Sequence, residues 1–285
     1  MKKILSIVLV FSMVLALGAL AFADDAELKL VNPGKFTVAI SPDFAPMEFV
    51  DISKSGQDQY VGFDPMLAAF IAEELGLELL IKPMSFDACQ AAVQSKNVDC
   101  SISGFSWTET RAENFLLSDY YYAGDNETEQ AIIVLKDKEN TFSTADDFAG
   151  LTVGAQVASL QYNYCTTQLP DTVNVEVYTD IGTAVEALRN GKIDALAVAK
   201  GNGDAIIANN DAVAFSGFLF DVSAEEENNV IMLNKDSEDL LEAINECLAK
   251  AYEAGYYGEW YAEAEALAGI ESASEVSYDD EGNAA

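Results

Sequence analysis

The chain has 285 residues, half of them apolar, which is enough to bury one large or two modest cores. Its 48 acidic residues face 15 basic ones, and the formal net charge of −33 argues against nucleic acids and anionic membrane surfaces as partners. The sequence contains no histidine, which excludes Ser-His-Asp and Cys-His catalysis and the commonest transition-metal ligand.

The N-terminus predicts export. Lys2 and Lys3 precede an apolar run over residues 4–21, and Ala21-Phe22-Ala23 forms an A-x-A cleavage site. A transmembrane anchor is the competing interpretation, but the run is short and ends in small residues. We expect a signal peptide over residues 1–23, cleaved after Ala23, and a periplasmic or extracellular protein without a lipid-attachment cysteine.

The cysteines Cys89, Cys100, Cys165 and Cys247 show no C-x-x-C spacing, so neither a zinc site nor a redox motif is expected. Cys89 and Cys100 either form a disulfide in an oxidising compartment or remain buried thiols, and the apolar context slightly favours thiols. The sequence predicts no metal site and no cofactor.

The first half of the chain alternates strands and helices. Asp64 with Pro65, and later Asp87, are typical of helix starts, and Gly76 is typical of a helix end. Such a βαβαβ unit implies a mainly parallel sheet with helices on both faces and a ligand crevice outside the carboxyl ends of the strands. The predicted elements are a strand at 35–40, a helix at 64–76, a strand at 77–82, a helix at 87–95 and a strand at 98–103.

The second half repeats this pattern. Segments 94–103 (QSKNVDCSIS) and 189–198 (RNGKIDALAV) both leave a helix, cross a polar turn and enter a strand through an aspartate. Two lobes with a cleft between them are therefore expected. The further predicted elements are a strand at 130–136, a Thr144–Asp147 capping box, a strand at 151–156, a helix capped by Ser159, a strand at 173–178, a helix capped by Asp180, a strand at 193–198, a crossing at 215–223, a strand at 230–233 and a helix at 237–254.

We expect the chain to divide into the signal peptide, two lobes and a tail. Lobe 1 is discontinuous because the chain leaves it for lobe 2 and returns, with hinges near residues 123–130 and 217–223. The predicted boundaries are 1–23 for the signal peptide, 24–123 and 222–270 for lobe 1, 124–221 for lobe 2, and 271–285 for a disordered tail.

The stretch SISGFSWTETR, residues 101–111, is the strongest candidate site. Gly104 permits close approach at a corner where Ser106 and backbone N–H groups can donate hydrogen bonds. Thr108 is a good N-cap and leaves Arg111 on the first turn of a short helix, where its guanidinium favours a carboxylate. An ordinary surface pair of Arg111 with Glu113 or Asp119 is the alternative. Because Phe44 and Phe86 also follow strands, their shared position favours an anion-binding cleft.

With these motifs the chain resembles the extracellular solute-binding proteins, family 3, of amino-acid ABC transporters. The resemblance covers roughly residues 35–265 and rests on FAPMEF (44–49), GFDPMLAAFIAEELG (62–76), SFDA (85–88), SGFSWTETRAENFLLSDYYY (103–122) and NGKIDAL (190–196). It implies an α/β protein with the two-lobe type II periplasmic binding fold and a ligand in the cleft between the lobes.

The resemblance also implies the site residues. Aromatic rings at Phe44 and Phe86 hold the ligand's side chain, and the corner with Arg111 takes its α-carboxylate. Ser159 of the second lobe donates to the same carboxylate. The full set of expected ligand-binding residues is Phe44, Phe86, Gly104, Phe105, Ser106, Arg111, Ser159, Ala199 and Lys200, with no catalytic residue.

Two positions depart from the family pattern. Val157-Ala158-Ser159 keeps the hydroxyl of a Gly-Ser-Thr turn but has lost its glycine. Ala199 stands where the family has the acidic residue that receives the α-ammonium, with Lys200 beside it. Either another carboxylate replaces it, from Asp43, Glu48 or residues 225–227, or the ligand is not a standard α-amino acid, in which case Lys200 can meet a second anionic group.

The expected function is therefore that of a monomeric solute-binding protein, not an enzyme. It captures an amino acid or related small carboxylate and delivers it to an ABC transporter permease. The alternative is a periplasmic enzyme on the same fold, such as a prephenate or arogenate dehydratase, for which Lys200 and Glu48 are the candidate general acids. The sequence names neither the ligand nor the orientation of Trp107, for which a core or rim position is favoured.

Overall fold

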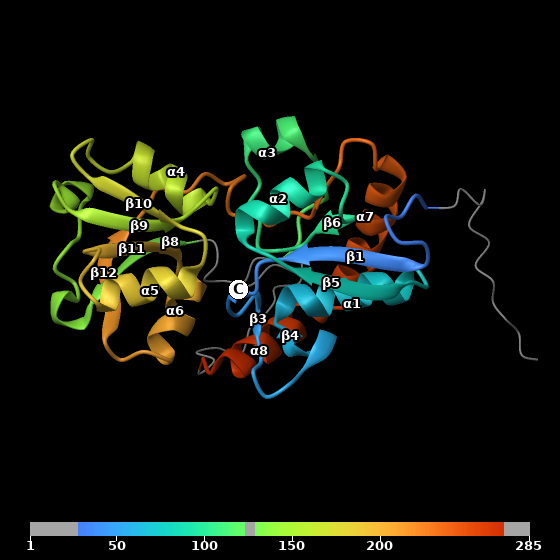
Figure 1. Ribbon diagram of the computed structural model, residues 1–285, viewed down its shortest axis with the longest axis horizontal. Coiled ribbons are helices and arrows are strands. Elements are labelled where there is room, and N and C mark those ends of the chain that lie inside the picture. Colours follow the sequence, from blue (N-terminus) through green and yellow to red (C-terminus); the bar gives the residue numbers. More distant parts are fainter. Residues whose placement is uncertain (1–27, 123–128, 271–285) are drawn as a thin grey trace, which may run out of the picture.

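The computed structural model describes residues 28–122 and 129–270, so the predicted signal peptide and the C-terminal tail lie outside the described residues. Two five-stranded sheets form the centres of two lobes (Figure 1). The sheet of lobe 1 consists, in spatial order, of β5 (Glu78–Pro83), β1 (Lys35–Ile40), β6 (Cys100–Ser101), β13 (Met232–Leu233) and β7 (Leu116–Leu117). The sheet of lobe 2 consists of β10 (Asn174–Tyr178), β9 (Thr152–Gln156), β11 (Ala195–Ala199), β8 (Gln130–Leu135) and β12 (Val213–Leu219).

The two sheets share one topology. In each sheet the first three strands run parallel, and the fourth, β13 or β8, is antiparallel to its neighbours. Each antiparallel strand is the first one that the chain forms after arriving from the other lobe. The expected mainly parallel sheets and the repeated architecture are confirmed.

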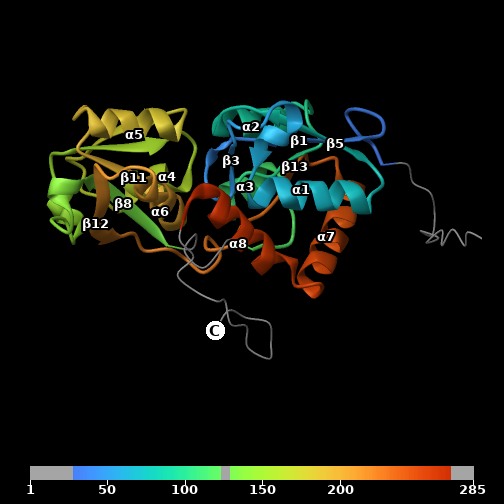
Figure 2. The same cartoon turned by 90° about the horizontal axis from the view of Figure 1, so that it is seen from below.

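Helices cover both faces of each sheet (Figures 1 and 2). Lobe 1 carries α1 (Phe63–Glu74), α2 (Phe86–Gln94), α3 (Glu109–Asn114), α7 (Glu238–Glu253) and α8 (Tyr256–Ala268), together with a small sheet of β2 (Asp43–Phe44), β3 (Glu48–Val50) and β4 (Tyr60–Val61) and a 3-10 helix at Gly56–Gln59. Lobe 2 carries α4 (Leu160–Thr167), α5 (Ile181–Arg189) and α6 (Lys200–Ala208), with 3-10 helices at Lys136–Lys138 and Ala145–Phe148.

Strand alternation explains why helices are needed on both sides. Phe36, Val38 and Ile40 of β1 enter the core that α1, α7 and α8 close, whereas Ala39 enters the core on the α2 face. In β8, the side chain of Ile133 enters a different core from those of its neighbours in the same way. A strand that is apolar on both faces must be buried on both faces.

Several helix starts follow the sequence. Thr108, Ser159 and Asp180 each accept a hydrogen bond from a backbone N–H in the first turn of their helix, as predicted. The Thr144–Asp147 capping box is also present.

Other predictions are wrong. The N-cap of α1 is Gly62 rather than Asp64, whose carboxylate accepts long-range hydrogen bonds instead. The N-cap of α2 is Ser85 rather than Asp87. Residues 215–219 of the predicted crossing pair with β8 as part of β12, because their apolar side chains complete that sheet.

The sequence also left α6 and α8 unpredicted. Gly201 and Gly203 lower the helix propensity of α6, and α8 follows Gly255 directly after α7. The predicted lobe boundaries stay predictions, since the first crossing includes residues 123–128, which are not described. No helix in the described part of the chain is both long and apolar enough to span a membrane.

All four cysteines are buried and free, so the Cys89–Cys100 disulfide is not formed. Trp107 is half-buried and packs against the core under α2.

Phe63→Ala is expected to destabilise lobe 1 severely. The Phe63 ring is fully buried and packs against Tyr121, Tyr122, Tyr257 and Trp260, with centroids 5.7–6.1 Å away, so it joins α1 to α8. Its removal should cost about 3–5 kcal/mol of unfolding free energy, measured by urea denaturation. Ile52→Ala, at a side chain 95% exposed, is the matched control and should change it by less than about 0.5 kcal/mol. Equal effects of the two substitutions would contradict this packing.

Candidate functional site

The corner after β6 brings two parts of lobe 1 into close contact. Gly104 has φ +53°, and a Cβ there would lie 2.7 Å from the Phe44 ring. A side chain at this position would therefore both strain the backbone and displace Phe44. The glycine allows an aromatic ring of β2 to pack directly on the corner.

Arg111 is the charged centre of the site. Its side chain is 6% exposed, and its guanidinium donates to the carbonyl oxygens of Ser106 at 2.6 Å and Ala158 at 3.3 Å. The guanidinium carbon lies 5.6 Å from the centre of the Phe86 ring and 5.2 Å from that of Phe105. Burial lowers the pKa of Arg111 to about 10, partly opposed by the charge of Glu226, so the group stays protonated at neutral pH.

No ion pair joins Arg111 to a carboxylate among the described residues. The predicted surface alternative, a pair with Glu113 or Asp119, is therefore not formed. A buried cation surrounded by carbonyl dipoles and aromatic rings, without a paired anion, remains costly until an anion joins it. The arrangement is chemically suited to a carboxylate.

A cavity of about 20 Å³ lies beside Arg111, between the lobes. Six of the predicted residues line it: Phe44, Phe86, Gly104, Ser106, Arg111 and Ser159. Four further lining residues were not predicted: Ser103, Gln156, Leu160 and Gln161. Gln156 and Gln161 flank Ser159 at the carboxyl end of β9, the same signal that singled out Phe44 and Phe86.

The remaining three predicted residues do not line the cavity. Phe105 lies behind the Phe86 ring, with centroids 4.5 Å apart, and Ala199 is buried at the end of β11. The Lys200 ammonium lies 2.9 Å from Asp204 and over the ring of Phe215, at 4.7 Å from its centre.

The Gly104 N–H was expected to donate to a ligand, but it donates to Asp64 Oδ2 at 2.8 Å. The hydroxyl of Ser103 is likewise engaged, because it accepts from Ser41 N–H at 2.9 Å and lies 2.5 Å from Glu48 Oε1. These bonds turn polar groups of the corner inward. These hydrogen bonds fix the shape of the corner, and the Gly104 N–H and the Ser103 hydroxyl are not free to bind a ligand.

Glu48 and Asp64 form a buried carboxyl pair beneath the corner. Both are 0% exposed, and they lie close enough for the charge of Asp64 to act on Glu48. When both carboxyl groups are ionised, Glu48 Oε2 and Asp64 Oδ1 accept no hydrogen bond. One proton held between the two groups supplies the missing hydrogen bond. Burial, and then the charge of Asp64, raise the pKa of Glu48 well above its usual range, and burial also raises the pKa of Asp64.

This pair predicts a pH dependence of stability. An acid whose pKa is raised by folding keeps its proton when the unfolded chain, with a Glu pKa near 4.5, has lost it. The native state then binds more protons, so stability falls as pH rises from about 4.5 toward the raised pKa, by up to about 1.4 kcal/mol per pH unit. Glu48→Gln, which always offers an N–H donor, should flatten the decline in thermal midpoint between pH 5 and pH 8.

Glu242→Gln on the exposed surface of α7 removes the same charge and serves as the control. It should leave the slope of the wild-type profile in place. Parallel profiles for Glu48→Gln and the wild-type protein would show that the pair carries no shared proton.

Comparisons with known proteins agree with this geometry. Bacterial extracellular solute-binding proteins, family 3, match the chain over residues 36–263. The L-cystine-binding protein TcyJ of Escherichia coli K12 is 29% identical over 251 residues, covering 87% of this chain and 89% of that protein. The arginine-binding extracellular protein ArtP of Bacillus subtilis is 29% identical over 223 residues, covering 78% and 82%.

A solved structure extends the likeness to three dimensions. The amino acid ABC transporter substrate-binding protein AbpA of Streptococcus pneumoniae, bound to L-arginine, matches with a TM-score of 0.76 and 33% identity, over 84% of this chain and 97% of that chain. The fold is the two-lobe type II periplasmic binding fold. The chain belongs to the bacterial extracellular solute-binding proteins, family 3.

Proposed function

We propose that the protein binds an amino acid or related small carboxylate between its lobes and delivers it to the permease of an ABC importer. The observation that carries the proposal is the buried Arg111 guanidinium, which has no carboxylate partner among the described residues and faces a cavity lined from both lobes. Relatives named for binding cystine and arginine support an amino acid as the solute class.

In the proposed site, Arg111 binds the carboxylate and Ser106 and Ser159 lie beside it. Phe44 and Phe86 contact the remainder of the ligand. Gln156 and Gln161, from lobe 2, supply amide groups on the opposite wall. Phe105 acts from behind, by holding the ring of Phe86 against the guanidinium.

Ligand entry requires the lobes to separate, because a cavity of about 20 Å³ holds little more than one water molecule. Several polar side chains join the lobes in the arrangement described, including Arg111, whose guanidinium donates to Ala158 O of lobe 2. Asp43 Oδ2 accepts from Ile181 N–H at 2.8 Å and from Gln156 Nε2 at 3.0 Å, and Asn202 Nδ2 donates to Ala45 O at 2.9 Å. Closure of the lobes around the ligand is the proposed capture step.

Three of the carboxylates considered as substitutes at the Ala199 position, Asp43, Glu48 and Glu226, are engaged elsewhere. Asp43 binds α5, and Glu48 is buried behind Ser103. Glu226 accepts from the hydroxyls of Tyr164 and Ser223, both at 2.9 Å. These contacts support recognition of the ligand through its own carboxylate and not through its ammonium group. The ligand screen below therefore pairs each amino acid with its N-acylated form, which lacks the ammonium.

We propose a binding role without catalysis. The two candidate general acids of the enzyme alternative do not reach the cavity, since Lys200 pairs with Asp204 and the Glu48 carboxyl lies beneath the corner. We further propose that the chain acts as a monomer and is exported, with residues 1–23 removed after Ala23.

Arg111→Met is expected to abolish ligand binding. The test is a thermal-shift screen of the chain from Asp24 against amino acids, their N-acylated forms and dicarboxylates, followed by calorimetry. A ligand at a hundred times its dissociation constant should stabilise the native state by about 2.7 kcal/mol. In Arg111→Met the affinity should fall at least about a hundredfold, because a buried charge-assisted hydrogen-bond pair is lost.

Arg189→Met removes an exposed arginine that pairs with Glu186 and should leave this affinity unchanged. No shift with any compound, or equal affinity in Arg111→Met, would overturn the proposed function.

Asp43→Ala is expected to shift the unliganded protein toward an open form. Burial raises the pKa of Asp43 despite its hydrogen bonds, which means that desolvation offsets part of their gain. We therefore expect the carboxylate to stabilise the closed form by about 1 kcal/mol, or about fivefold in population. Small-angle scattering should report a larger radius of gyration. Asp43→Asn keeps an acceptor for Ile181 N–H and should stay close to the wild type. An unchanged scattering curve for Asp43→Ala would count against this contact as a closing interaction.

A further inference from the structure

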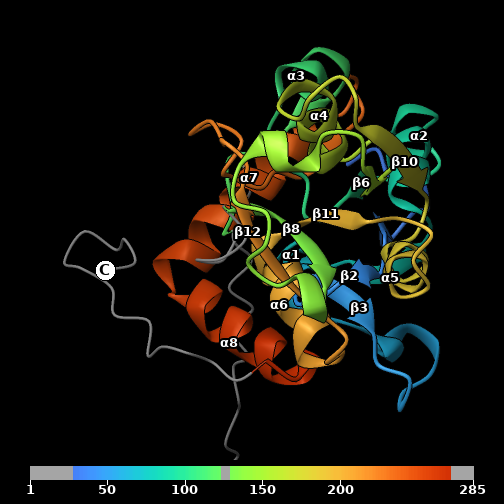
Figure 3. The ribbon, with the colours of Figure 1, turned by 90° about the vertical axis from the view of Figure 1, so that its left-hand side faces the viewer.

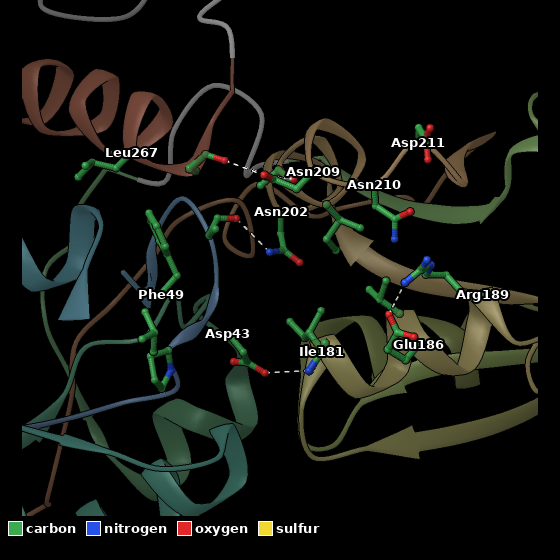
Figure 4. Close-up of a pocket in the computed structure, with 18 residues that line it drawn as sticks. Asp43, Phe49, Ile181, Glu186, Arg189, Asn202, Asn209, Asn210, Asp211 and Leu267 are labelled. Carbon is green, nitrogen blue, oxygen red and sulfur yellow. Dashed lines mark hydrogen bonds and ion pairs between the residues drawn. The ribbon is translucent and has the colours of Figure 1, made fainter. Parts of the chain in front are cut away.

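A second, larger space lies between the lobes. This groove has a volume of about 740 Å³ and is lined by the β2–β3 segment of lobe 1, by α5 and α6 of lobe 2, and by the end of α8 (Figure 4). Figure 3 shows α5 and α6 beside β2 and β3, on the opposite side from α3 and α4. No residue lines both this groove and the Arg111 cavity, and the Asp43–Gln156 hydrogen bond lies between the two.

Asn202 gives the groove an acceptor that lacks a donor. The residue is 2% exposed, and its Nδ2 donates to Ala45 O at 2.9 Å, which fixes the orientation of the amide. Its Oδ1 is buried without a hydrogen-bond partner, and Figure 4 shows this oxygen turned toward the space between Asp43 and Ile181. A buried unsatisfied carbonyl costs about 1–3 kcal/mol, which a ligand N–H would recover.

The charge of the groove favours a cation. Asp43, Glu186 and Asp211 line it, whereas its one lining cation, Arg189, is already paired with Glu186 at 2.6 Å. The negative charge of the lining therefore exceeds the positive charge, and the acidity of the whole chain adds to the attraction.

The rest of the lining is suited to an alkyl chain. Phe49, Ile181, Val185, Ile206 and Leu267 line the groove between the polar groups. A volume of this size that combines apolar side chains with directed polar groups is typical of small-molecule sites.

We propose that this groove is a second binding site, separate from the Arg111 cavity, for a small organic cation that carries N–H groups, an alkylamine or alkylguanidinium. One N–H binds Asn202 Oδ1, the positive charge lies near Asp43, and the alkyl part packs on the apolar wall. Since both lobes line the groove, its occupant stabilises the closed arrangement and so raises the affinity of the Arg111 cavity for its ligand. By the same factor, a ligand in the Arg111 cavity raises the affinity of the groove for its occupant.

The test is calorimetric titration of the chain from Asp24, in 150 mM salt, with butylguanidinium and butylamine. Tetramethylammonium carries the charge without an N–H, and 1-butanol carries the alkyl chain without the charge. We expect saturable one-to-one binding of at least one of the first two probes. In a ¹⁵N-labelled sample, that probe should shift the backbone signals of Gly182 and Ala205, in the groove, and not that of Gly104, in the cavity.

Two variants separate the sites. Asn202→Leu, of similar size but without the acceptor, should weaken the probe about tenfold. Gln161→Met, a change in the Arg111 cavity whose side-chain hydrogen bond to Gln130 stays within lobe 2, should change its affinity by less than about twofold, because Gln161 does not line the groove.

Several outcomes would overturn the inference. The first is no saturable binding of either probe. The second is equal binding of tetramethylammonium, which would mean attraction to an acidic surface only. The others are equal binding of 1-butanol and loss of binding in Gln161→Met. Because the probes carry no carboxylate, failure here leaves the proposed function of the Arg111 cavity intact. Conversely, failure of every carboxylate to bind leaves the groove open to this test.

Discussion

The structure is organised around one unfavourable placement, a guanidinium buried at the meeting point of two lobes. Arg111 keeps its charge because the carbonyls of Ser106 and Ala158 and the rings of Phe86 and Phe105 surround it. Every nearby element serves that placement. Thr108 caps the helix that carries Arg111. Among the three parallel strands of each sheet, the first in the chain lies between the second and the third, and this order brings the ends of β6 and β9 to the space between the lobes. The cost of burying this charge is the physical reason why the proposed ligand carries an anionic group.

A second constraint holds the floor of the site rigid. Asp64 of α1 and Glu48 of β3 are fully buried and accept hydrogen bonds from Gly104 N–H and the Ser103 hydroxyl, respectively. The corner is therefore pre-organised by two carboxyl groups that do not line the Arg111 cavity, which reduces the ordering that ligand binding in the proposed site requires. In contrast, the contacts of Asp43 and Asn202 cross between the lobes and must break whenever the cleft opens. In the proposed function, the buried Asp64 and Glu48 fix the shape of the site, whereas the contacts of Asp43 and Asn202 change when the lobes open and close.

The sequence predicted those features that depend on neighbouring residues. The cap at Thr108 and the position of Arg111 depend on residues only three positions apart. The local pattern of each segment is likewise enough to predict β1 and β9. Features that depend on distant residues were missed. The Asp64–Gly104 hydrogen bond spans 40 positions, whereas the local pattern around Asp64 predicts a helix cap. Lys200 was placed at the site because it follows Ala199, yet α6 begins there and pairs it with Asp204 one turn later. That i,i+4 spacing was visible in the sequence and was the better guide.

The buried thiols have a consequence for how the chain matures. Cys89, Cys100, Cys165 and Cys247 lie in cores of both lobes, unpaired, and burial raises the pKa of each, to about 12 for Cys89 and Cys165 and about 11 for Cys247. Oxidants attack thiolates, and these groups are neither ionised at ordinary pH nor within reach of solvent. Native packing thus protects the sulfur atoms that the chain leaves unlinked. Folding of this protein needs neither an oxidase nor a disulfide isomerase, and the finished molecule is indifferent to the redox poise of its surroundings.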